Sequence, residues 1–155
     1  MKPVPETVAT FLRGKRIAVA GVSRGGRAPS NAILKRFREC GYEVFQVNPA
    51  ATEIAGERCY PDLRSVPVPL DGVMIATAPS ASKDVVSQCA ELGITRVWFH
   101  RSFGEGSVSP EALATCRAHH IEPIVGGCPM MYCGSVDIFH TCMRWWLRSS
   151  GKVPG

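Results

Sequence analysis

The chain has 155 residues, of which 45% are hydrophobic and 20% charged, the balance of an ordinary globular protein. This length fits one domain around one core, and the composition excludes a disordered, collagen-like or coiled-coil protein. No apolar run approaches the roughly 20 residues that span a bilayer. The opening stretch MKPVPETVAT also lacks the apolar core of a signal peptide. We therefore expect a cytoplasmic protein with no membrane contact.

The net charge of +5 is concentrated near the N-terminus. Residues 1–40 hold nine Lys or Arg side chains and only two Glu side chains. This bias predicts an anionic partner. Because no basic run, aromatic platform or nucleic-acid motif accompanies it, a small anion is favoured over nucleic acid.

Short runs rich in Val and Ile alternate with longer amphipathic stretches, which is typical of strands and helices around a parallel sheet. The expected fold is an α/β Rossmann-like three-layer sandwich with a five-stranded parallel sheet, plus a C-terminal amphipathic helix. The predicted strands are residues 16–21, 43–48, 72–77, 96–100 and 122–127.

Helices are predicted at the start of the chain and between the strands. A short helix around residues 5–12 precedes the first strand, and residues 31–40 form the next helix. A third helix runs from about Lys83 to Leu92, with Ser80 or Ser82 as its N-cap, and a fourth begins at Ser109 and Pro110. Prolines in residues 55–71 discourage a long element there, so this passage is predicted to be an irregular crossover.

A glycine-rich turn follows the first predicted strand. Gly21 and Gly26 take the first and third places of a G-x-G-x-x-G dinucleotide motif, and Ser23 takes the middle place. Gly21 permits a tight turn, and the following helix presents its N-terminal N–H groups to an anion. Ser23 adds a hydroxyl donor, while Arg24 and Arg27 add positive charge. The turn is therefore a candidate phosphate site.

The end of the second predicted strand narrows the choice of nucleotide. A fold that binds NAD usually carries an acidic residue there, which holds the ribose hydroxyls. Here the strand ends in Asn48-Pro49. Together with Arg24 and Arg27, this favours a multiply phosphorylated adenine nucleotide over plain NAD, while a small NADP-dependent oxidoreductase stays an alternative.

Residues 21–25 also spell G-x-S-x-G, the turn that carries a hydrolase's nucleophilic serine. Partner residues for a catalytic triad occur in the required chain order. The hydrolase fold, however, takes its oxyanion loop from upstream, and little chain precedes Gly21. A hydrolase is therefore disfavoured; the candidate partners of Ser23 would be Asp71, Asp84, His100, His119 and His140.

Several stretches together resemble the small stand-alone CoA-binding domain proteins, relatives of the nucleotide-binding half of the succinyl-CoA synthetase alpha subunit. The resemblance covers residues 10–130 and rests on the ordered set G-x-S, G-Y-E-V, V-N-P, Y-P-x-L, I-A-T-A-P and C-P. It implies a Rossmann-like fold and coenzyme A as the ligand. It also implies contacts to phosphate from Gly21, Ser23, Arg24 and Ser30, and contacts along the nucleotide from Asn48, Pro49, Thr77, Ala78 and Pro79. The synthetase's phosphohistidine belongs to a domain that this sequence lacks.

The seven cysteines are interpreted mainly as buried thiols. Cys128, Cys133, His140 and Cys142 could surround zinc, but their spacing fits no common zinc template, so no metal is expected. Cys128 ends the fifth predicted strand, and a disulfide exchange between it and the thiol of bound coenzyme A is a further hypothesis.

The remaining histidines have structural interpretations. His119 and His120 are expected to cap the end of a helix. His100 follows the fourth predicted strand and either faces the ligand or bonds to its own loop.

We divide the chain into a CoA-binding domain at residues 1–130 and a helical extension at 131–155 that packs on it. In the extension, residues 136–148 place an apolar stripe at helical spacing. Docking on the same domain is the favoured interpretation. A homodimer or partner surface formed by this tryptophan-rich helix is the alternative.

The function favoured by the sequence is non-catalytic binding of coenzyme A or acyl-CoA. An NADP-dependent oxidoreductase would need a substrate domain or a catalytic Tyr-Lys pair, and neither is found. A protein-interaction module that uses the C-terminal helix is the third hypothesis.

Overall fold

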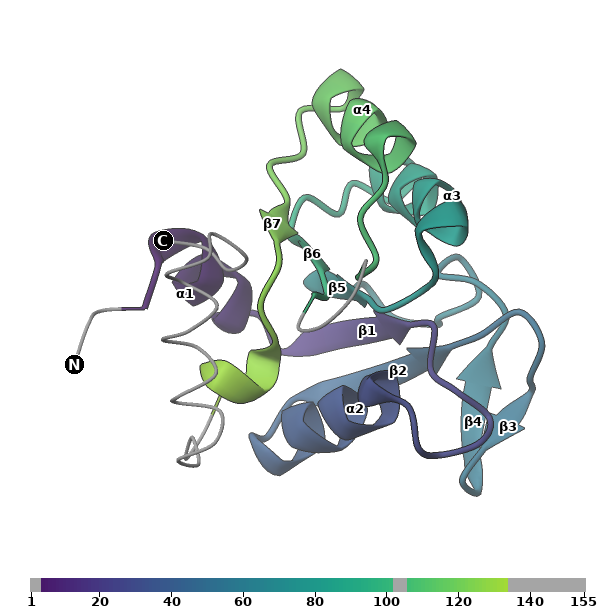
Figure 1. The fold of residues 1–155 in the computed structure, drawn as a ribbon. Helices are drawn as coiled ribbons and strands as arrows, with labels where there is room; N and C mark the ends of the chain where they lie inside the picture. Colours follow the sequence, from purple (N-terminus) through teal and green to yellow (C-terminus); the bar gives the residue numbers. More distant parts are fainter. Residues whose placement is uncertain (1–3, 102–105, 134–155) are drawn as a thin grey trace.

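The computed structural model of the protein describes residues 4–101 and 106–133. The strands of this part form one sheet of seven, in the order β3-β4-β2-β1-β5-β6-β7 (Figure 1). All five predicted strands are present, pair in parallel with their neighbours and are somewhat shorter than predicted. They are β1 (Arg16–Ala20), β2 (Glu43–Val47), β5 (Gly72–Ile75), β6 (Val97–Phe99) and β7 (Ile124–Val125).

The prediction of five strands is wrong by two, because residues 51–60 contain a hairpin. β3 (Glu53–Ile54) pairs antiparallel with β4 (Glu57–Tyr60), and β4 pairs in parallel with β2. The two connecting residues have φ values of +54° and +77°, as in the tight turns of short hairpins. The amide of Gln46, on β2, donates to three backbone carbonyls of the hairpin. This side chain lies on another strand, 8 to 12 residues before its partners, so the local propensity of residues 51–60 does not reveal the pairing.

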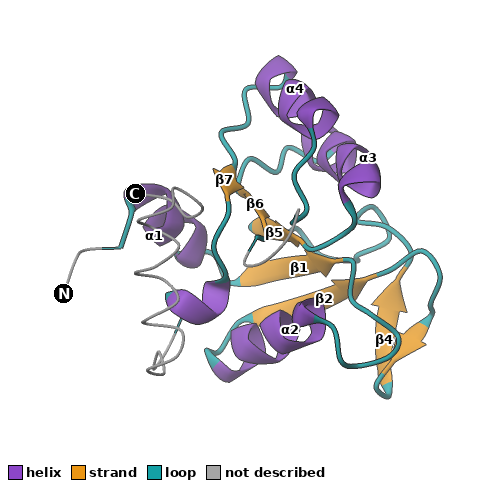
Figure 2. Cartoon of the chain, in the orientation of Figure 1, coloured by secondary structure: helices purple, strands orange, loops and turns teal. Residues whose placement is uncertain are grey.

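Helices cover both faces of the sheet, which gives the expected three layers (Figures 1 and 2). One face carries α1 (Glu6–Leu12), α2 (Pro29–Glu39) and the short 3-10 helix η1 (Pro129–Met131). The opposite face carries α3 (Pro79–Glu91) and α4 (Pro110–Ala118).

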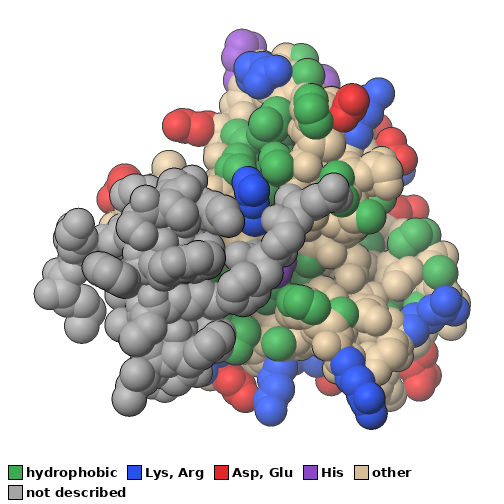
Figure 3. Space-filling model, in the orientation of Figure 1, with side chains coloured by type: hydrophobic (Ala, Val, Ile, Leu, Met, Phe, Trp, Pro, Cys, Tyr) green, Lys and Arg blue, Asp and Glu red, His purple; other side chains and the backbone are tan. Residues whose placement is uncertain are grey.

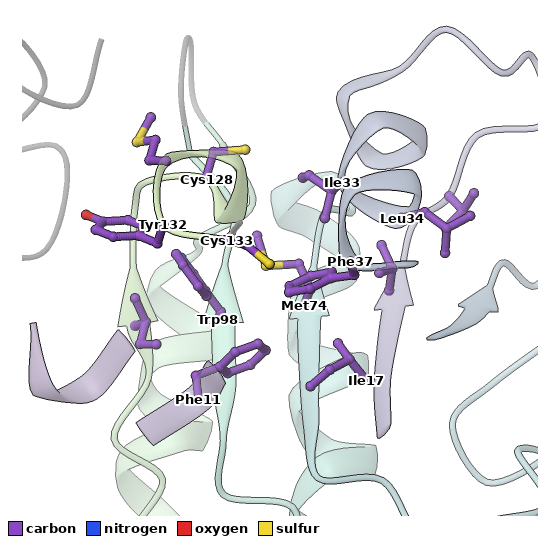
Figure 4. Packing of buried hydrophobic residues seen from close by; sticks show 14 of the residues in the cluster. Phe11, Ile17, Ile33, Leu34, Phe37, Met74, Trp98, Cys128, Tyr132 and Cys133 are labelled. Atoms are coloured by element: carbon purple, nitrogen blue, oxygen red, sulfur yellow. The ribbon is translucent and has the colours of Figure 1, made fainter. Parts of the chain in front are cut away.

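Successive side chains of β1 point to opposite faces of the sheet and so belong to two separate parts of the core. Ile17 and Val19 pack with α1 and α2, whereas Ala18 and Ala20 pack with α3 and α4. On the first face, Phe11 of α1 meets the ring of Trp98 edge-on, with centroids 5.3 Å apart (Figure 4). The small alanines of β1 leave room on the second face near the end of the strand.

Three helices begin with proline at their first turn, where the missing N–H costs no hydrogen bond. Ser109 caps α4 as predicted, since its hydroxyl accepts from the Ala112 N–H at 3.1 Å. The predicted cap of α3 is wrong: the helix starts at Pro79, and no side chain caps it. Ser82 instead turns inward, where its hydroxyl donates to the carbonyl of Ser107.

Within the described residues, no helix is long and apolar enough to cross a bilayer. The predicted helix at 136–148 lies outside the described residues, and the domain boundary at 130 stays a prediction. Residues 131–133 are buried in the core on the side of α1 and α2.

Candidate functional site

The site lies where the strand order reverses. β1 occupies the middle of the parallel sheet, with β2 on one side and β5 on the other. The loop that follows β1 leads to α2 on one face of the sheet, whereas the loop that follows β5 leads to α3 on the opposite face. The two loops therefore start side by side and then run in opposite directions. In open α/β sheets, ligands bind in the crevice that this divergence creates.

A cavity of about 430 Å³ occupies this position. Half of the ten predicted site residues line it, and they come from three different loops. These residues are Gly21, Asn48, Pro49, Thr77 and Ala78. The topology therefore joins residues that are up to 57 positions apart in the sequence.

The walls of this cavity are mostly apolar, with carboxylates and an amide at one side. Ala20 and Val47 from the strand ends contribute apolar surface, and no Lys or Arg is among the lining residues that belong to the described part of the chain. Asp62 and Asp84 add negative charge, and Gln88 uses its carbonyl oxygen to accept from the Leu63 N–H at 2.8 Å. A pocket of this character suits an uncharged ring better than a phosphate.

One wall of the cavity comes from α3, which was not predicted to contribute to the site. Ala81, Asp84, Val85 and Gln88 line the cavity at positions i, i+3, i+4 and i+7 of one helix face. That spacing was visible in the sequence. Only Ala81 lies outside the helix that was predicted from Lys83 to Leu92, and the other three residues lie inside it. The sequence alone does not indicate that this face of the helix borders the cavity.

Gly21 is required by the backbone. Its φ is +93°, and a β-carbon there would lie 2.7 Å from both the Ala76 oxygen and the Thr77 nitrogen. The loop that follows β1 therefore packs directly against the loop that follows β5. Any side chain at position 21 would separate the two loops that border the cavity.

Two asparagine side chains hold the glycine turn in place. Asn48 donates to the Val22 carbonyl at 2.9 Å, and Asn31 donates to the Ser23 carbonyl at 2.8 Å. The carbonyl oxygen of Asn48 also accepts from the Ala50 N–H at 2.7 Å. The Asn48 side chain thus orients the turn, and its expected contact with a nucleotide stays a prediction. Asn31 was missed because its partner lies in a loop of irregular conformation.

The remaining predicted residues of the turn surround the start of α2. Within the described residues no side chain caps this helix. Pro29 has no N–H, and the Asn31 N–H donates to the Ala28 carbonyl at 3.0 Å, which leaves the Ser30 N–H of the first turn available for an anion. The Ser30 hydroxyl is buried there, and it has no hydrogen-bond partner among the residues that the structure describes. Arg24 and Arg27 are exposed, and Figure 3 shows Lys and Arg side chains along the edge formed by α2 and the preceding loop.

Ser23 adopts a local turn. Its hydroxyl oxygen accepts from the Gly25 N–H at 3.2 Å, which leaves the hydroxyl hydrogen as a donor.

Asp71 does not fit the role of the acid in a hydrolase triad with Ser23. Its carboxylate accepts from the N–H groups of Lys15 and Arg16 at the opposite end of β1. Backbone hydrogen bonds from Arg16 and Lys15 accordingly lower the pKa of Asp71.

Pro79 lies apart from the main cavity. It begins α3 and lines a second hollow, together with Lys83, Arg101 and the start of α4. The structure therefore places nine of the ten predicted residues at the main cavity or in the adjoining glycine turn and start of α2, and one beside them.

Two other candidate groups, His100 and Cys128, are buried. Burial lowers the pKa of His100 and raises the pKa of Cys128 to about 11, which disfavours a thiolate at Cys128. His119 ends α4 as predicted. Among the described residues, no group of His, Cys, Asp and Glu could hold a metal ion, although His140 and Cys142 lie outside that part.

The family profile described as CoA binding domain matches residues 15–134. The chain belongs to this family. The match confirms the resemblance found in the sequence, and it spans the glycine turn, the cavity and both core layers.

Several relatives support this assignment. An ADP-forming acetate–CoA ligase of Archaeoglobus fulgidus is 32% identical over 82 residues, which cover 52% of this chain and 12% of the ligase. An uncharacterized protein of Bacillus subtilis, YneT, is 29% identical over 100 residues, which cover 64% of this chain and 71% of that one. The chain thus spans about an eighth of the ligase and most of the small protein.

Solved structures agree with the fold. A conserved hypothetical protein from Pyrococcus furiosus is 30% identical with a TM-score of 0.64, over 74% of this chain and 95% of that chain. A hypothetical protein from Pyrococcus horikoshii has a TM-score of 0.71 at 24% identity, over 83% and 93% of the two chains, and this likeness concerns the fold alone.

Proposed function

We propose that the protein binds coenzyme A, free or acylated, and catalyses no reaction on it. The observation that carries the proposal is the cavity at the reversal of strand order, which adjoins the glycine turn inside the region matched by the CoA-binding family. Its volume of about 430 Å³ lies within the range of small-molecule sites.

The distribution of charge supports an orientation for the ligand. The adenine and ribose occupy the main cavity, because its lining is mostly apolar and contains no basic side chain. The phosphates lie at the glycine turn, where the start of α2, the unpartnered Ser30 hydroxyl and the exposed Arg24 and Arg27 favour negative charge. Ser23 directs its remaining hydrogen to a phosphate oxygen.

Two further observations favour a binding role over catalysis. The candidate nucleophile Ser23 and the carboxylate of Asp71 lie beyond opposite ends of β1. Cys128 is 5% exposed, and its raised pKa keeps the thiol protonated near neutral pH. The ADP-forming ligase named above extends well beyond the matched segment, and its activity is therefore not carried over.

A thermal-shift panel with coenzyme A, dephospho-coenzyme A, NADP, NAD and ATP tests the proposal. A ligand that binds only the native state raises the melting temperature, by roughly 5–10 °C at about 100 times its dissociation constant. We expect the largest shift with coenzyme A. A clear shift with NADP and none with coenzyme A would instead support the oxidoreductase alternative. Native mass spectrometry of the purified protein would identify a ligand that remains bound.

A further inference from the structure

The second hollow adjoins the main cavity at the first turn of α3. Its volume is about 690 Å³, and it is bordered by the starts of α3 and α4 and by Arg101, which lies beyond the end of β6. Ala81 lines the main cavity, whereas Ser80 and Lys83 line the second hollow. Neighbouring residues of one helix therefore contribute to both spaces.

Lys83 and Arg101 supply the positive charge of the second hollow. Among the residues that the structure describes, neither side chain forms an ion pair, and the Nε atom of Arg101 is buried without a hydrogen-bond partner. Glu111 lines the same hollow but does not pair with either of them. Both cations are therefore available to a ligand.

The balance of charge in the second hollow suits a single carboxylate. Its described lining residues carry two positive charges, from Lys83 and Arg101, and one negative charge, from Glu111, which leaves a net charge of +1. One carboxylate balances this charge, whereas a phosphate monoester, with a charge of about −1.5 to −2 near neutral pH, would exceed it. The planar guanidinium of Arg101 also matches the two oxygens of a carboxylate.

The starts of two helices add to this preference for negative charge. Both α3 and α4 begin at the second hollow, and the N-terminal end of a helix stabilises an anion nearby. Ser109, which lines the hollow, is 7% exposed, and its hydroxyl oxygen accepts from the Ala112 N–H. In the described part of the chain the hydroxyl hydrogen has no acceptor, so it can be donated to a carboxylate oxygen.

The remaining wall of the second hollow is apolar. Pro79, Val108 and Pro110 contribute hydrocarbon surface there. A charged group alone would leave this surface in contact with water, whereas a short aliphatic chain attached to the carboxylate would cover it. The lining therefore favours an aliphatic carboxylate over an inorganic anion.

We propose that the second hollow binds the carboxylate of a short aliphatic acid. The carboxylate lies between Lys83 and Arg101, and the hydrocarbon chain lies against Val108 and the two prolines. This chemistry has two sources, a free acid and the acyl group of a coenzyme A thioester that ends in a second carboxylate. Because the hollow adjoins the main cavity, we expect the thioester, and this source rests on the proposed function.

Titration calorimetry of the full chain with glutaryl-CoA, butyryl-CoA and sodium butyrate tests the proposal. The two thioesters differ by one carboxylate at the end of the acyl chain. We expect the wild type to bind glutaryl-CoA about 10-fold more tightly than butyryl-CoA. Lys83→Gln and Arg101→Gln should each remove most of this preference. The matched control Arg117→Gln, at an exposed position of α4 that does not line the hollow, should retain it.

The three ligands distinguish the outcomes. Equal binding of the two thioesters without binding of butyrate would overturn the inference and leave the binding of coenzyme A intact. So would a preference for glutaryl-CoA that both variants retain. Binding of butyrate that Lys83→Gln weakens, without a preference between the thioesters, would support the hollow with a free acid as its ligand.

Failure of the proposed function has a separate signature. If neither thioester binds, the proposed function fails, and the butyrate titrations of the wild type and Lys83→Gln still decide whether the second hollow binds a carboxylate. Lys83 is exposed on its helix, so its replacement should leave the fold intact. The comparison therefore remains decisive even if Arg101→Gln fails to fold.

Discussion

The side-chain amide of Asn48 donates a hydrogen bond of 2.9 Å to the backbone carbonyl of Val22, and so ties the end of β2 to the glycine turn. The same side chain accepts from the Ala50 N–H, which fixes the orientation of its amide. The turn that borders the cavity is thus held by a side chain from the neighbouring strand. Preorganisation of this kind lowers the entropy lost when a ligand binds.

Asn48→Asp tests the importance of this bond. The substitution preserves the size of the side chain but replaces the donating NH₂ group with an oxygen, which would face the Val22 carbonyl. We expect about 10-fold weaker binding of coenzyme A and a loss of stability of about 1–2 kcal/mol. Titration calorimetry and denaturant unfolding measure the two effects. Unchanged affinity in a folded variant would show that the bond does not shape the site.

Gly21→Ala should destabilise the protein strongly, because the added β-carbon would lie 2.7 Å from two backbone atoms of the loop after β5. We expect a cost of about 2–4 kcal/mol in denaturant unfolding. Gly26→Ala is a matched control, since Gly26 also has a positive φ but its β-carbon would meet nothing within 4 Å. That variant should lose only about 1 kcal/mol. Equal losses in the two variants would rule out the close approach as the cause.

Removal of both arginines from the glycine turn should weaken phosphate binding while leaving the fold intact. Arg24 and Arg27 are exposed, and substitutions at such positions usually change stability by about 0.5 kcal/mol or less. We expect Arg24→Gln/Arg27→Gln to bind coenzyme A about 10- to 100-fold more weakly at low salt. Lys35→Gln removes a positive charge from the middle of α2 and serves as the control. An equal loss in this control would indicate a general effect of net charge.

The hairpin depends on Gln46, which is 2% exposed and donates to the carbonyls of Ile54, Glu57 and Arg58. Gln46→Leu keeps a similar volume but leaves these buried carbonyls with fewer donors. We expect the free energy of unfolding to fall by about 1–3 kcal/mol, and hydrogen exchange to become faster in β3 and β4 before the rest of the sheet. Protection that stays uniform would contradict this role.

The stability of the protein should also depend on Asp71. Its folded pKa lies below the usual range of aspartate, chiefly because the N–H of Arg16 hydrogen-bonds to the ionised carboxylate. A lowered folded pKa adds stability above the unfolded pKa, and this stability is lost as the pH falls through the folded value. Unfolding free energies measured between about pH 6 and about pH 2 should therefore decline less in Asp71→Asn than in the wild type. Parallel curves would argue against this linkage.

The sequence predicted those parts of the fold that local patterns encode. Apolar runs located β1, β2, β5, β6 and β7, and Ser109-Pro110 located the start of α4. Contacts between distant residues account for what was missed. The hairpin β3–β4 depends on Gln46, and the inward turn of Ser82 depends on a carbonyl 25 residues away.

In the candidate site, too, some features were predictable from the sequence and others depend on contacts made only in the folded chain. Gly21 and the residues at the ends of β2 and β5 were predicted because the topology of a parallel sheet brings such loops together. The hydrogen bonds by which Asn31 and Asn48 hold the glycine turn could not be predicted. Both side chains donate to backbone carbonyls whose direction is set only in the folded loop. The wall that α3 contributes was not predicted, because no local pattern indicates which face of this helix borders the cavity.

Calorimetric titration of coenzyme A into the wild-type protein and into Ala81→Trp tests the central claim most directly. Ala81 is exposed on the first turn of α3 and lines the cavity, so an indole there would fill the space assigned to the nucleotide. The account predicts saturable binding of one coenzyme A per chain by the wild type and at least 10-fold weaker binding by a folded Ala81→Trp variant. No binding to the wild type, or equal affinity in the two proteins, would contradict it.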